Sequence, residues 1–280
     1  MQDLEILRGD IRDPETITPA MDGVTTVYHL AALISIPYSF GAIQSYIDTN
    51  VTGTANVLQA ARAAGVARFV HVSSSEVYGT GLTQKMNERH PLKPRSPYAA
   101  SKLAADKLAE AFHIAYDLPV IIVRPFNAFG PRQSLRAVIP TIIRQALNED
   151  YIHLGSIRTQ RDWTFVQDTV DALILAGEAD EGILGKTINV GTGLMRSVAQ
   201  VVEEVCRLVD REGMVVKLEN QRVRMGNSEV SQLCCDNHLA KLLLGWQPNV
   251  TFTKGLEQTI RWMREWLRDG RYNRENTYEI

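Results

Sequence analysis

Short runs of consecutive apolar residues alternate along this chain with stretches in which apolar residues recur at helical spacing. The apolar runs predict strands over residues 24–30, 69–72, 120–123, 163–166 and 187–190. The helical spacing predicts helices over residues 49–64, 97–116 and 168–179, and Gly65 is a typical helix stop for the first. Strands that are apolar throughout and alternate with helices favour a parallel sheet covered on both faces. We therefore expect an α/β fold with a doubly wound parallel sheet.

The pattern becomes less regular after Asn127. Residues 128–160 carry several prolines and glycines, and we expect them to form an insertion over the edge of the sheet. Helices and short strands resume after residue 197 and end in an amphipathic stretch over 256–267. The prediction is a sheet domain of residues 1–127 plus 160–192, and a smaller α+β lobe of residues 128–159 plus 193–280.

Composition narrows the class of protein. The chain has 280 residues, of which 45% are hydrophobic and 22% charged, as in ordinary globular proteins. A net charge of -2 gives no electrostatic reason to expect nucleic acid or an anionic membrane as a partner. We find no signal-peptide pattern and no apolar run long enough to span a membrane. The three cysteines, Cys206, Cys234 and Cys235, lack the spacing of a metal site or a disulfide framework, so we expect reduced thiols in a cytoplasmic protein.

Tyr98 and Lys102 are the first candidates for chemistry. They stand four residues apart in a predicted helix, so they share one helix face. A tyrosine acting as a base near neutral pH needs its pKa of about 10 lowered by about 3 units, roughly 4 kcal/mol, and a neighbouring ammonium acts in that direction. Ser74 and Glu76 follow the end of a predicted strand, where doubly wound sheets gather their catalytic groups. Together these residues predict a site that oxidises an alcohol.

Several ordered motifs resemble the extended short-chain dehydrogenase/reductases that act on nucleotide sugars. The motifs are Gly9-Asp10-Ile11-Arg12-Asp13, His29-Leu30-Ala31-Ala32, Asn50-Val51-Thr52-Gly53-Thr54, Ser73–Gly79, Tyr98 with Lys102, Arg124–Pro131, Arg161-Asp162-Trp163, Gly191-Thr192-Gly193 and Leu244–Pro248. The resemblance implies a Rossmann-type sheet, NAD as cofactor and a UDP-linked nucleotide sugar as substrate.

The resemblance also implies roles for individual residues. The catalytic residues would be Ser74, Ser75, Glu76, Tyr98 and Lys102. Contacts to the cofactor would come from Asp10, Ile11, Leu30, Ala31, Ala32, Asn50, Val72, Tyr98, Lys102 and Pro125. Contacts to the substrate would come from Asn127, Gln133, Val138, Ile139, Arg161 and Arg224.

Glu76 separates a 4,6-dehydratase from a 4-epimerase, although UDP-glucuronate decarboxylases carry a similar Ser-Glu pair. All these enzymes oxidise the sugar 4-hydroxyl, but a 4,6-dehydratase also needs a base for the proton at carbon 5, and Glu76 is placed like that base. Ser75 stands where dTDP-glucose dehydratases carry an aspartate, and the triplet Ser74-Ser75-Glu76 is closer to the Thr-Ser-Glu of GDP-mannose dehydratases. The segments 74–80 and 136–140 most resemble 4,6-dehydratases of the legionaminic acid type, which act on nucleotide-activated N-acetylglucosamine. A 4-epimerase is the second reading and a UDP-glucuronate decarboxylase the third.

Two further expectations concern the whole chain. No Gly-x-x-Gly-x-x-Gly precedes Tyr98, so the first strand–helix–strand unit is expected to be missing, and a non-catalytic fragment or a nucleotide-sugar-binding remnant remains an alternative. The helix over 97–116 is apolar on more than one face, which indicates a further packing partner. Because family members pair this helix with the one over 49–64, we expect a homodimer with a four-helix interface.

Overall fold

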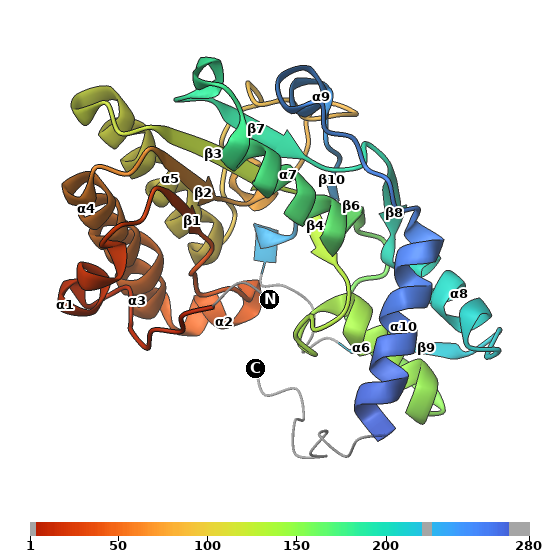
Figure 1. Ribbon diagram of the computed structural model, residues 1–280. Helices are drawn as coiled ribbons and strands as arrows, with labels where there is room; N and C mark the ends of the chain where they lie inside the picture. The colour runs from red at the N-terminus through yellow and green to blue at the C-terminus, as the bar shows by residue number, and fades with distance from the viewer. Residues whose placement is uncertain (1–3, 220–225, 269–280) are drawn as a thin grey trace.

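Four parallel strands form the central sheet of the computed structural model, which describes residues 4–219 and 226–268 (Figure 1). Their order is β1 (Thr26–His29), β2 (Arg68–Val72), β3 (Val120–Pro125) and β7 (Thr187–Val190). Every neighbouring pair is parallel, with His71 opposite His29 on one side and Ile122 on the other. The carboxyl ends of β1, β2 and β3 therefore meet at one edge, where the site lies.

Helices cover both faces of this sheet, as the alternating pattern predicts. α4 (Thr54–Ala64) and α5 (Pro97–Tyr116) lie on one face, and α7 (Val166–Glu178) lies on the other, next to α9 (His238–Leu244) (Figure 1). A separate buried apolar cluster fills each interface. The prediction of a doubly wound, Rossmann-type parallel sheet is confirmed.

The ends of α5 show why the prediction of its bounds is correct. The Ser96 side chain accepts a hydrogen bond from the backbone N–H of Ala99, and Pro97 occupies the first helical position. At the other end Asp117 adopts a left-handed conformation with φ 54°, which stops the helix. Strong local signals at both ends thus fix the helix that carries Tyr98 and Lys102.

The segment before α4 differs from the prediction. One continuous helix was expected over 49–64, but the chain forms a π-helix, η2 (Ile47–Gly53), that runs into α4. Ile11 packs closely against Gly53, where a Cβ atom would lie 2.7 Å from the Ile11 side chain. A glycine is needed at this approach, and the wider π-turn is a frequent feature near functional sites.

Residues 128–160 are more regular than predicted. They contain most of β4 (Asn127–Phe129), all of α6 (Val138–Asn148) and β5 (Tyr151–Leu154). The prediction of an irregular insertion was wrong because Pro140 falls in the first turn of α6, where a proline costs the helix no hydrogen bond.

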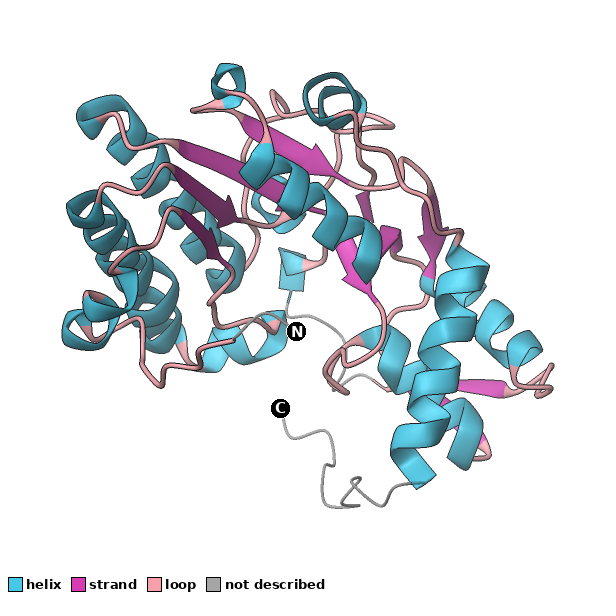
Figure 2. Ribbon diagram, viewed as in Figure 1, coloured by secondary structure: helices cyan, strands magenta, loops and turns pink. Residues whose placement is uncertain are grey.

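The second lobe is built around a second sheet and a separate two-stranded one. β6 (Gln160–Phe165) pairs with β4, with β8 (Met195–Ser197) and with β10 (Gln232–Leu233), and β5 pairs with β9 (Val215–Leu218). Figure 2 shows these strands beyond the carboxyl ends of the first sheet. α6, α8 (Val198–Leu208) and α10 (Phe252–Arg268) pack around them over the largest apolar cluster. The remaining short elements are α1 (Pro14–Ile17), η1 (Pro19–Met21), α2 (Ile36–Gly41), α3 (Ile43–Tyr46), η3 (Ser75–Tyr78), η4 (Glu181–Ile183) and η6 (Gly226–Ser228).

β1 forms one edge of the central sheet. Within residues 4–219 and 226–268, no strand pairs with its outer side, and the described residues ahead of it form only α1 and η1. Tyr28 on this strand reaches across to α7, where its hydroxyl oxygen would lie 1.9 Å from a Cβ atom on Gly177. The edge strand is thus held by the helix on one face as well as by β2.

Asp162 ties the two sheets together. Its buried carboxylate accepts hydrogen bonds from the backbone N–H groups of Thr192 (2.8 Å), Gly193 (2.7 Å) and Cys235 (3.1 Å), and from the Thr192 hydroxyl (2.6 Å). Thr192 and Gly193 follow β7 of the first sheet, whereas Cys235 follows β10 of the second. One carboxylate on β6 therefore holds the segment after β7 and the segment after β10.

The substitution Asp162→Asn tests this anchor. The amide nitrogen would face backbone N–H groups, so we expect the free energy of unfolding to fall by about 1–3 kcal/mol in urea denaturation. The control is Asp180→Asn, at an exposed position, for which a change within about 0.5 kcal/mol is expected. Equal effects of the two substitutions would contradict the anchoring role.

Candidate active site

Lys102 is fixed at the carboxyl end of β2. Its Nζ donates a hydrogen bond of 2.6 Å to the carbonyl oxygen of Val72, and only 4% of the residue is exposed. Burial lowers the pKa of this ammonium from 10.5 to about 8, although the charge of Asp106 acts in the opposite direction. The predicted cofactor residue Val72 therefore also positions the predicted catalytic lysine.

The turn that follows β2 carries Ser74, Ser75 and Glu76. Ser74 is extended, and its hydroxyl caps η3 by accepting a hydrogen bond of 3.2 Å from the backbone N–H of Glu76. All three residues are buried. Gly79 ends the turn at φ 70°, and a Cβ atom there would lie 2.2 Å from the carbonyl oxygen of Lys93. A serine cap and a glycine stop thus force this turn to present its side chains at the edge of the sheet.

Tyr98 completes the group. Its hydroxyl is hydrogen-bonded to the Ser74 side chain, and its ring remains partly accessible. Burial raises the pKa of Tyr98 to about 12; the bond to Ser74 lowers it, and the charges of Glu76 and Asp106 raise it. The structure thus brings the predicted Ser74, Glu76, Tyr98 and Lys102 to one place.

Arg161 lies next to Glu76. Its Nε is 3.9 Å from Glu76 Oε1, and its Nη2 is 3.9 Å from Glu229 Oε1 on the other side. The arginine is 4% exposed and comes from β6 of the second sheet. This predicted substrate ligand therefore also places a positive charge beside the predicted base Glu76. Arg224, another predicted substrate ligand, lies outside the described residues.

Two predicted substrate residues carry buried oxygens without partners. Among the described residues, neither Asn127 Oδ1 nor Gln133 Oε1 has a hydrogen-bond partner. Gln133 is held close to Asn127, because its Nε2 donates to the carbonyl oxygen of Ala128 at 2.9 Å. Unsatisfied buried acceptors of this kind need an explanation, and a ligand that donates hydrogen bonds supplies one. Val138 is half-buried at the start of α6, whereas Ile139 is 1% exposed and packs in the core of the second lobe.

Four of the predicted cofactor residues stand at the carboxyl ends of β1 and β3. Leu30 and Ala31 follow β1 and are exposed, and Ala32 and Pro125 are half-buried. Apolar residues exposed at the carboxyl end of a sheet strand are suited to a flat aromatic ligand.

Asn50 has a structural part as well as its predicted cofactor contact. Its side chain exchanges hydrogen bonds with the backbone of Leu33, at 2.8 and 3.0 Å, and donates to the Ser101 hydroxyl at 2.9 Å. Ser101 in turn donates to the carbonyl oxygen of Tyr98 at 2.8 Å. Asn50 therefore ties the loop after β1 to the helix of the tyrosine.

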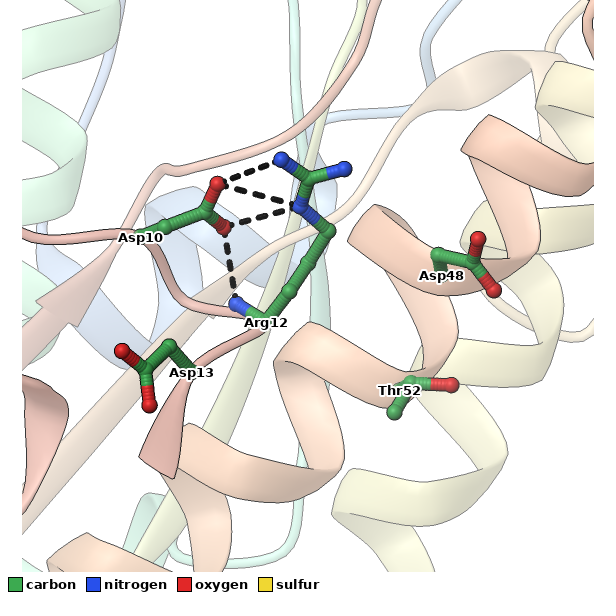
Figure 3. A pocket seen from close by; sticks show the side chains of 5 residues that line it. All are labelled: Asp10, Arg12, Asp13, Asp48 and Thr52. Carbon is green, nitrogen blue, oxygen red and sulfur yellow. Dashed lines mark hydrogen bonds and ion pairs between the residues drawn. The ribbon is translucent and has the colours of Figure 1, made fainter. Parts of the chain in front are cut away.

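Asp10 and Ile11 lie at the far end of the site. Asp10 accepts hydrogen bonds from the backbone N–H, Nε and Nη2 of Arg12, at 2.9, 3.0 and 2.6 Å (Figure 3). These bonds lower the pKa of the Asp10 carboxyl to about 2. An open pocket of ≈ 390 Å³ lies here, lined by Asp10, Arg12, Asp13, Asp48 and Thr52. Ile11 itself faces inward onto Gly53.

Two residues around Tyr98 and Lys102 were not predicted from the sequence. Tyr46 places its ring edge-on to Tyr98, with the centroids 6.3 Å apart, and its hydroxyl donates to the carbonyl oxygens of Ile34 and Ser35. Asp106 stands four residues after Lys102 and is wholly buried. For Tyr46 the sequence offers no signal, because 52 residues separate the two rings; for Asp106 the helical spacing is the signal.

The described residues contain no group of three or more histidine, cysteine, aspartate or glutamate side chains arranged to hold a metal ion. Nor, in the described part of the chain, is any helix both long and apolar enough to cross a membrane.

Fold and site together define the class. The sheet is parallel and doubly wound, and Tyr98 and Lys102 stand one helical turn apart on α5, with Tyr98 facing the serine that follows β2. This is the arrangement of a short-chain dehydrogenase/reductase. The sequence matches the family model described as GDP-mannose 4,6 dehydratase over residues 1–259, and the chain belongs to this family.

Similar proteins agree with this family. A dTDP-glucose 4,6-dehydratase from Xanthomonas campestris is 34% identical over 300 residues, covering 96% of this chain and 83% of that protein. A solved structure of a double mutant of DesIV, a dTDP-glucose 4,6-dehydratase from Streptomyces venezuelae with NAD and DAU bound, has a TM-score of 0.85 at 32% identity and covers 92% of this chain and 78% of its own. A UDP-glucuronic acid 4-epimerase from Bacillus cereus, in complex with UDP-glucuronic acid and NAD, has a TM-score of 0.85 at 27% identity, with coverage of 92% and 81%. The chain is therefore a member of a family of nucleotide-sugar 4,6-dehydratases that has 4-epimerases among its structural neighbours.

The buried ammonium gives a prediction about stability. A pKa lowered from 10.5 to about 8 means that the charged Lys102 destabilises the folded state by about 3 kcal/mol below pH 8. Loss of the bond to Val72 costs about 1 kcal/mol. Lys102→Met should therefore raise the free energy of unfolding by about 2 kcal/mol at pH 7.

The sign of the pH dependence follows from proton counts. Between pH 8 and 10.5 the unfolded chain holds a proton on Lys102 that the folded protein has lost, so the wild type gains stability as pH rises. The advantage of Lys102→Met should thus shrink toward zero at about pH 10. Urea denaturation of both proteins at pH 7 and at about pH 10 measures this difference in the free energy of unfolding. A difference that does not change with pH would show that the buried ammonium does not destabilise the folded state.

Proposed function

We propose that this protein is an NAD-dependent nucleotide-sugar 4,6-dehydratase. It would oxidise the sugar 4-hydroxyl and eliminate water across carbons 5 and 6, giving a 4-keto-6-deoxy sugar. The observation that carries the proposal is the buried carboxylate of Glu76, two residues after Ser74 in the same turn, beside the Tyr98–Ser74 pair. Oxidation and return of a hydride need no such carboxylate, whereas water loss does.

The residues around the tyrosine fit a nicotinamide cofactor. Leu30, Ala31 and Pro125 offer an accessible apolar surface at the strand ends, and Lys102 is fixed beneath it. Asp10 and the pocket around it would take the adenosine end. When bound, NAD supplies the acceptor for the hydride from carbon 4 and the donor for its return.

Tyr98 would take the proton of the 4-hydroxyl, with Ser74 hydrogen-bonded between them. Lowering the pKa of Tyr98 from about 12 to near 7 requires about 7 kcal/mol. One positive charge at about 4 Å contributes about 4 kcal/mol at an effective dielectric constant of 20. The Lys102 ammonium alone is thus insufficient, and the positive charge of an oxidised nicotinamide supplies a second contribution of the same sign.

Glu76 would take the proton from carbon 5, which the adjacent ketone has made acidic. Arg161, whose Nε lies 3.9 Å from Glu76 Oε1, places a positive charge beside this carboxylate. Ser75 has no readily released proton, so the acid for the departing 6-hydroxyl would be Glu76 itself, which returns the proton that it has just accepted. The hydride taken from carbon 4 would then be returned at carbon 6, and carbon 5 would take a proton that comes from solvent through Glu76. The balance is then one water lost and no net oxidation.

The finer part of the proposal concerns the substrate. The motif at 74–80 favours a UDP-linked N-acetylglucosamine, with Asn127 and Gln133 accepting hydrogen bonds from it and Arg161 and Arg224 facing the diphosphate. The structural likeness to a 4-epimerase keeps that reaction as the second candidate. The free, buried cysteines support a reducing, cytoplasmic location.

Product analysis with wild type and Glu76→Gln tests the reaction. With NAD and UDP-N-acetylglucosamine, we expect a product lighter by one water in mass spectrometry, and Glu76→Gln should lower its rate by about 10²–10⁴-fold. The matched control is Glu229→Gln, because Glu229 lies equally far from Arg161 but not in the catalytic turn. It should retain most of the activity.

Other outcomes assign other functions. A product of unchanged mass would indicate the 4-epimerase, and loss of carbon dioxide from UDP-glucuronate the decarboxylase. Nucleotide-sugar binding without measurable NAD affinity would indicate a binding remnant. Undiminished water loss by Glu76→Gln would remove the basis of the dehydratase proposal, and dTDP-glucose tested in parallel distinguishes the nucleotide.

We also propose a homodimer through α4 and α5. Ile114 is 80% exposed on the outer face of α5, and Ala100, Ala111 and Ala115 are exposed on the same helix. Small and apolar side chains of this kind suit close packing against a second helix pair.

Sedimentation tests the dimer. At micromolar concentration we expect wild type to sediment as a dimer, whereas Ile114→Glu places two charges in the interface and should yield monomers. Leu242→Glu, at a position 67% exposed on α9, is the matched control and should remain dimeric. A monomeric wild type would contradict the proposal.

A further inference from the structure

Asp106 lies on the same face of α5 as the two catalytic candidates. Tyr98, Lys102 and Asp106 follow one another at intervals of four residues, so their side chains form one row along the helix. Asp106 is 0% exposed, and Lys102 is 4% exposed. A carboxylate buried this deeply is costly unless cations and hydrogen-bond donors surround it.

The two strands that lead into the site supply those partners. Arg124 on β3 donates to Asp106 Oδ2 from Nε at 3.0 Å and lies 2.9 Å from it through Nη2. His71 on β2 places its Nε2 3.3 Å from Asp106 Oδ1. One carboxylate therefore connects the helix of Tyr98 with the strands that precede Ser74 and Asn127.

Arg124 is itself held from the far side. Its Nη1 donates to the Tyr78 hydroxyl at 3.0 Å, and that hydroxyl donates to Asn189 Oδ1 at 2.8 Å. The guanidinium is thus fixed between Asp106 and Tyr78. Such a buried network keeps one geometry, so Asp106 cannot turn away from Lys102 without breaking its bonds to Arg124.

The carboxylate of Asp106 is the negative charge that balances the buried cations around it. The other titratable or charged groups facing Lys102 and Asp106 are His29 on β1, His71 on β2, Tyr98 on α5 and Arg124 on β3, with Glu76 nearer to the substrate side. Burial lowers the pKa of both histidines, so they are neutral at pH 7. Arg124 contacts the carboxylate of Asp106 directly, and the buried Lys102 stands one helical turn away from Asp106 on the same face of α5.

We propose that Asp106 is a positioning residue for the reaction, which keeps the buried Lys102 side chain protonated beneath Tyr98 at neutral pH. This rests on the proposed function in so far as Tyr98 must act as a base beside an ammonium. Without Asp106, the buried cations Lys102 and Arg124 would lose the carboxylate that balances their charge. Lys102 would give up its proton first, because a guanidinium holds its proton far more strongly.

The test is the titration of Lys102 itself. In protein with ¹³C-labelled lysine, the Cε resonance of Lys102, assigned by its loss in Lys102→Arg, reports the ionisation of Nζ without any turnover. In wild type the midpoint should fall near pH 8. Asp106→Asn should lower it by about one unit or more, whereas Asp106→Glu, which keeps the charge, should leave it within about half a unit.

Two further variants separate electrostatics from structure. Glu110→Gln makes the same change four residues along the helix, where the glutamate pairs with Lys107 at the surface, and should not move the midpoint. Arg124→Gln removes a cation that shares Asp106, so the midpoint should rise. This variant keeps the test available if Asp106→Asn fails to fold.

The outcomes are distinct. A folded Asp106→Asn with an unmoved Lys102 midpoint would overturn the proposal, even if its melting temperature is lower, and so would a fall of the midpoint in Arg124→Gln. A shift of the midpoint in a protein that turns over no nucleotide sugar would support the role of Asp106 while the proposed function fails. Where activity is present, the alkaline limb of its pH profile should move to lower pH in Asp106→Asn by the same amount as the midpoint.

Discussion

A positive charge buried beside a tyrosine is the constraint on which the rest of this structure depends. Lys102 loses almost all contact with water, so the carbonyl oxygen of Val72 and the carboxylate of Asp106 must compensate. The bond of Lys102 to Val72 and the contact of Asp106 with His71 both join α5 to β2. Because Ser74 and Glu76 directly follow β2, the same placement sets their distance from Tyr98. The buried charges of Lys102 and Asp106 thus help to fix how Ser74 and Glu76 lie relative to Tyr98.

Local signals made much of this arrangement predictable. The capping serine, the proline and the helical spacing place α5 correctly, and apolar runs locate all four strands of the central sheet. The ordered motifs indicate the family, to which the chain does belong. Ser74, Glu76, Tyr98 and Lys102 were predicted as one site because parallel strands end at the same edge, and the structure brings them together.

What could not be predicted depends on contacts between distant segments. The position of Arg161 beside Glu76 arises only because β6 pairs in the second sheet. Tyr46 meets Tyr98 through the loop after β1, and the π-helix before α4 follows from the approach of Ile11 to Gly53. None of these pairings leaves a periodic trace in the sequence. α6 was missed for another reason, since a proline in its first turn resembles a helix breaker.

The role of Glu76 at carbon 5 is the central claim, and the fate of the hydrogen on that carbon tests it most directly. In deuterated water, nuclear magnetic resonance of the nucleotide-sugar product should show deuterium at carbon 5 with wild type. With Glu76→Gln this exchange should be lost, whereas a carboxylate-independent route would leave it unaffected. Retention of the carbon 5 hydrogen by wild type, with inversion at carbon 4 alone, would contradict the assignment of Glu76 as the base.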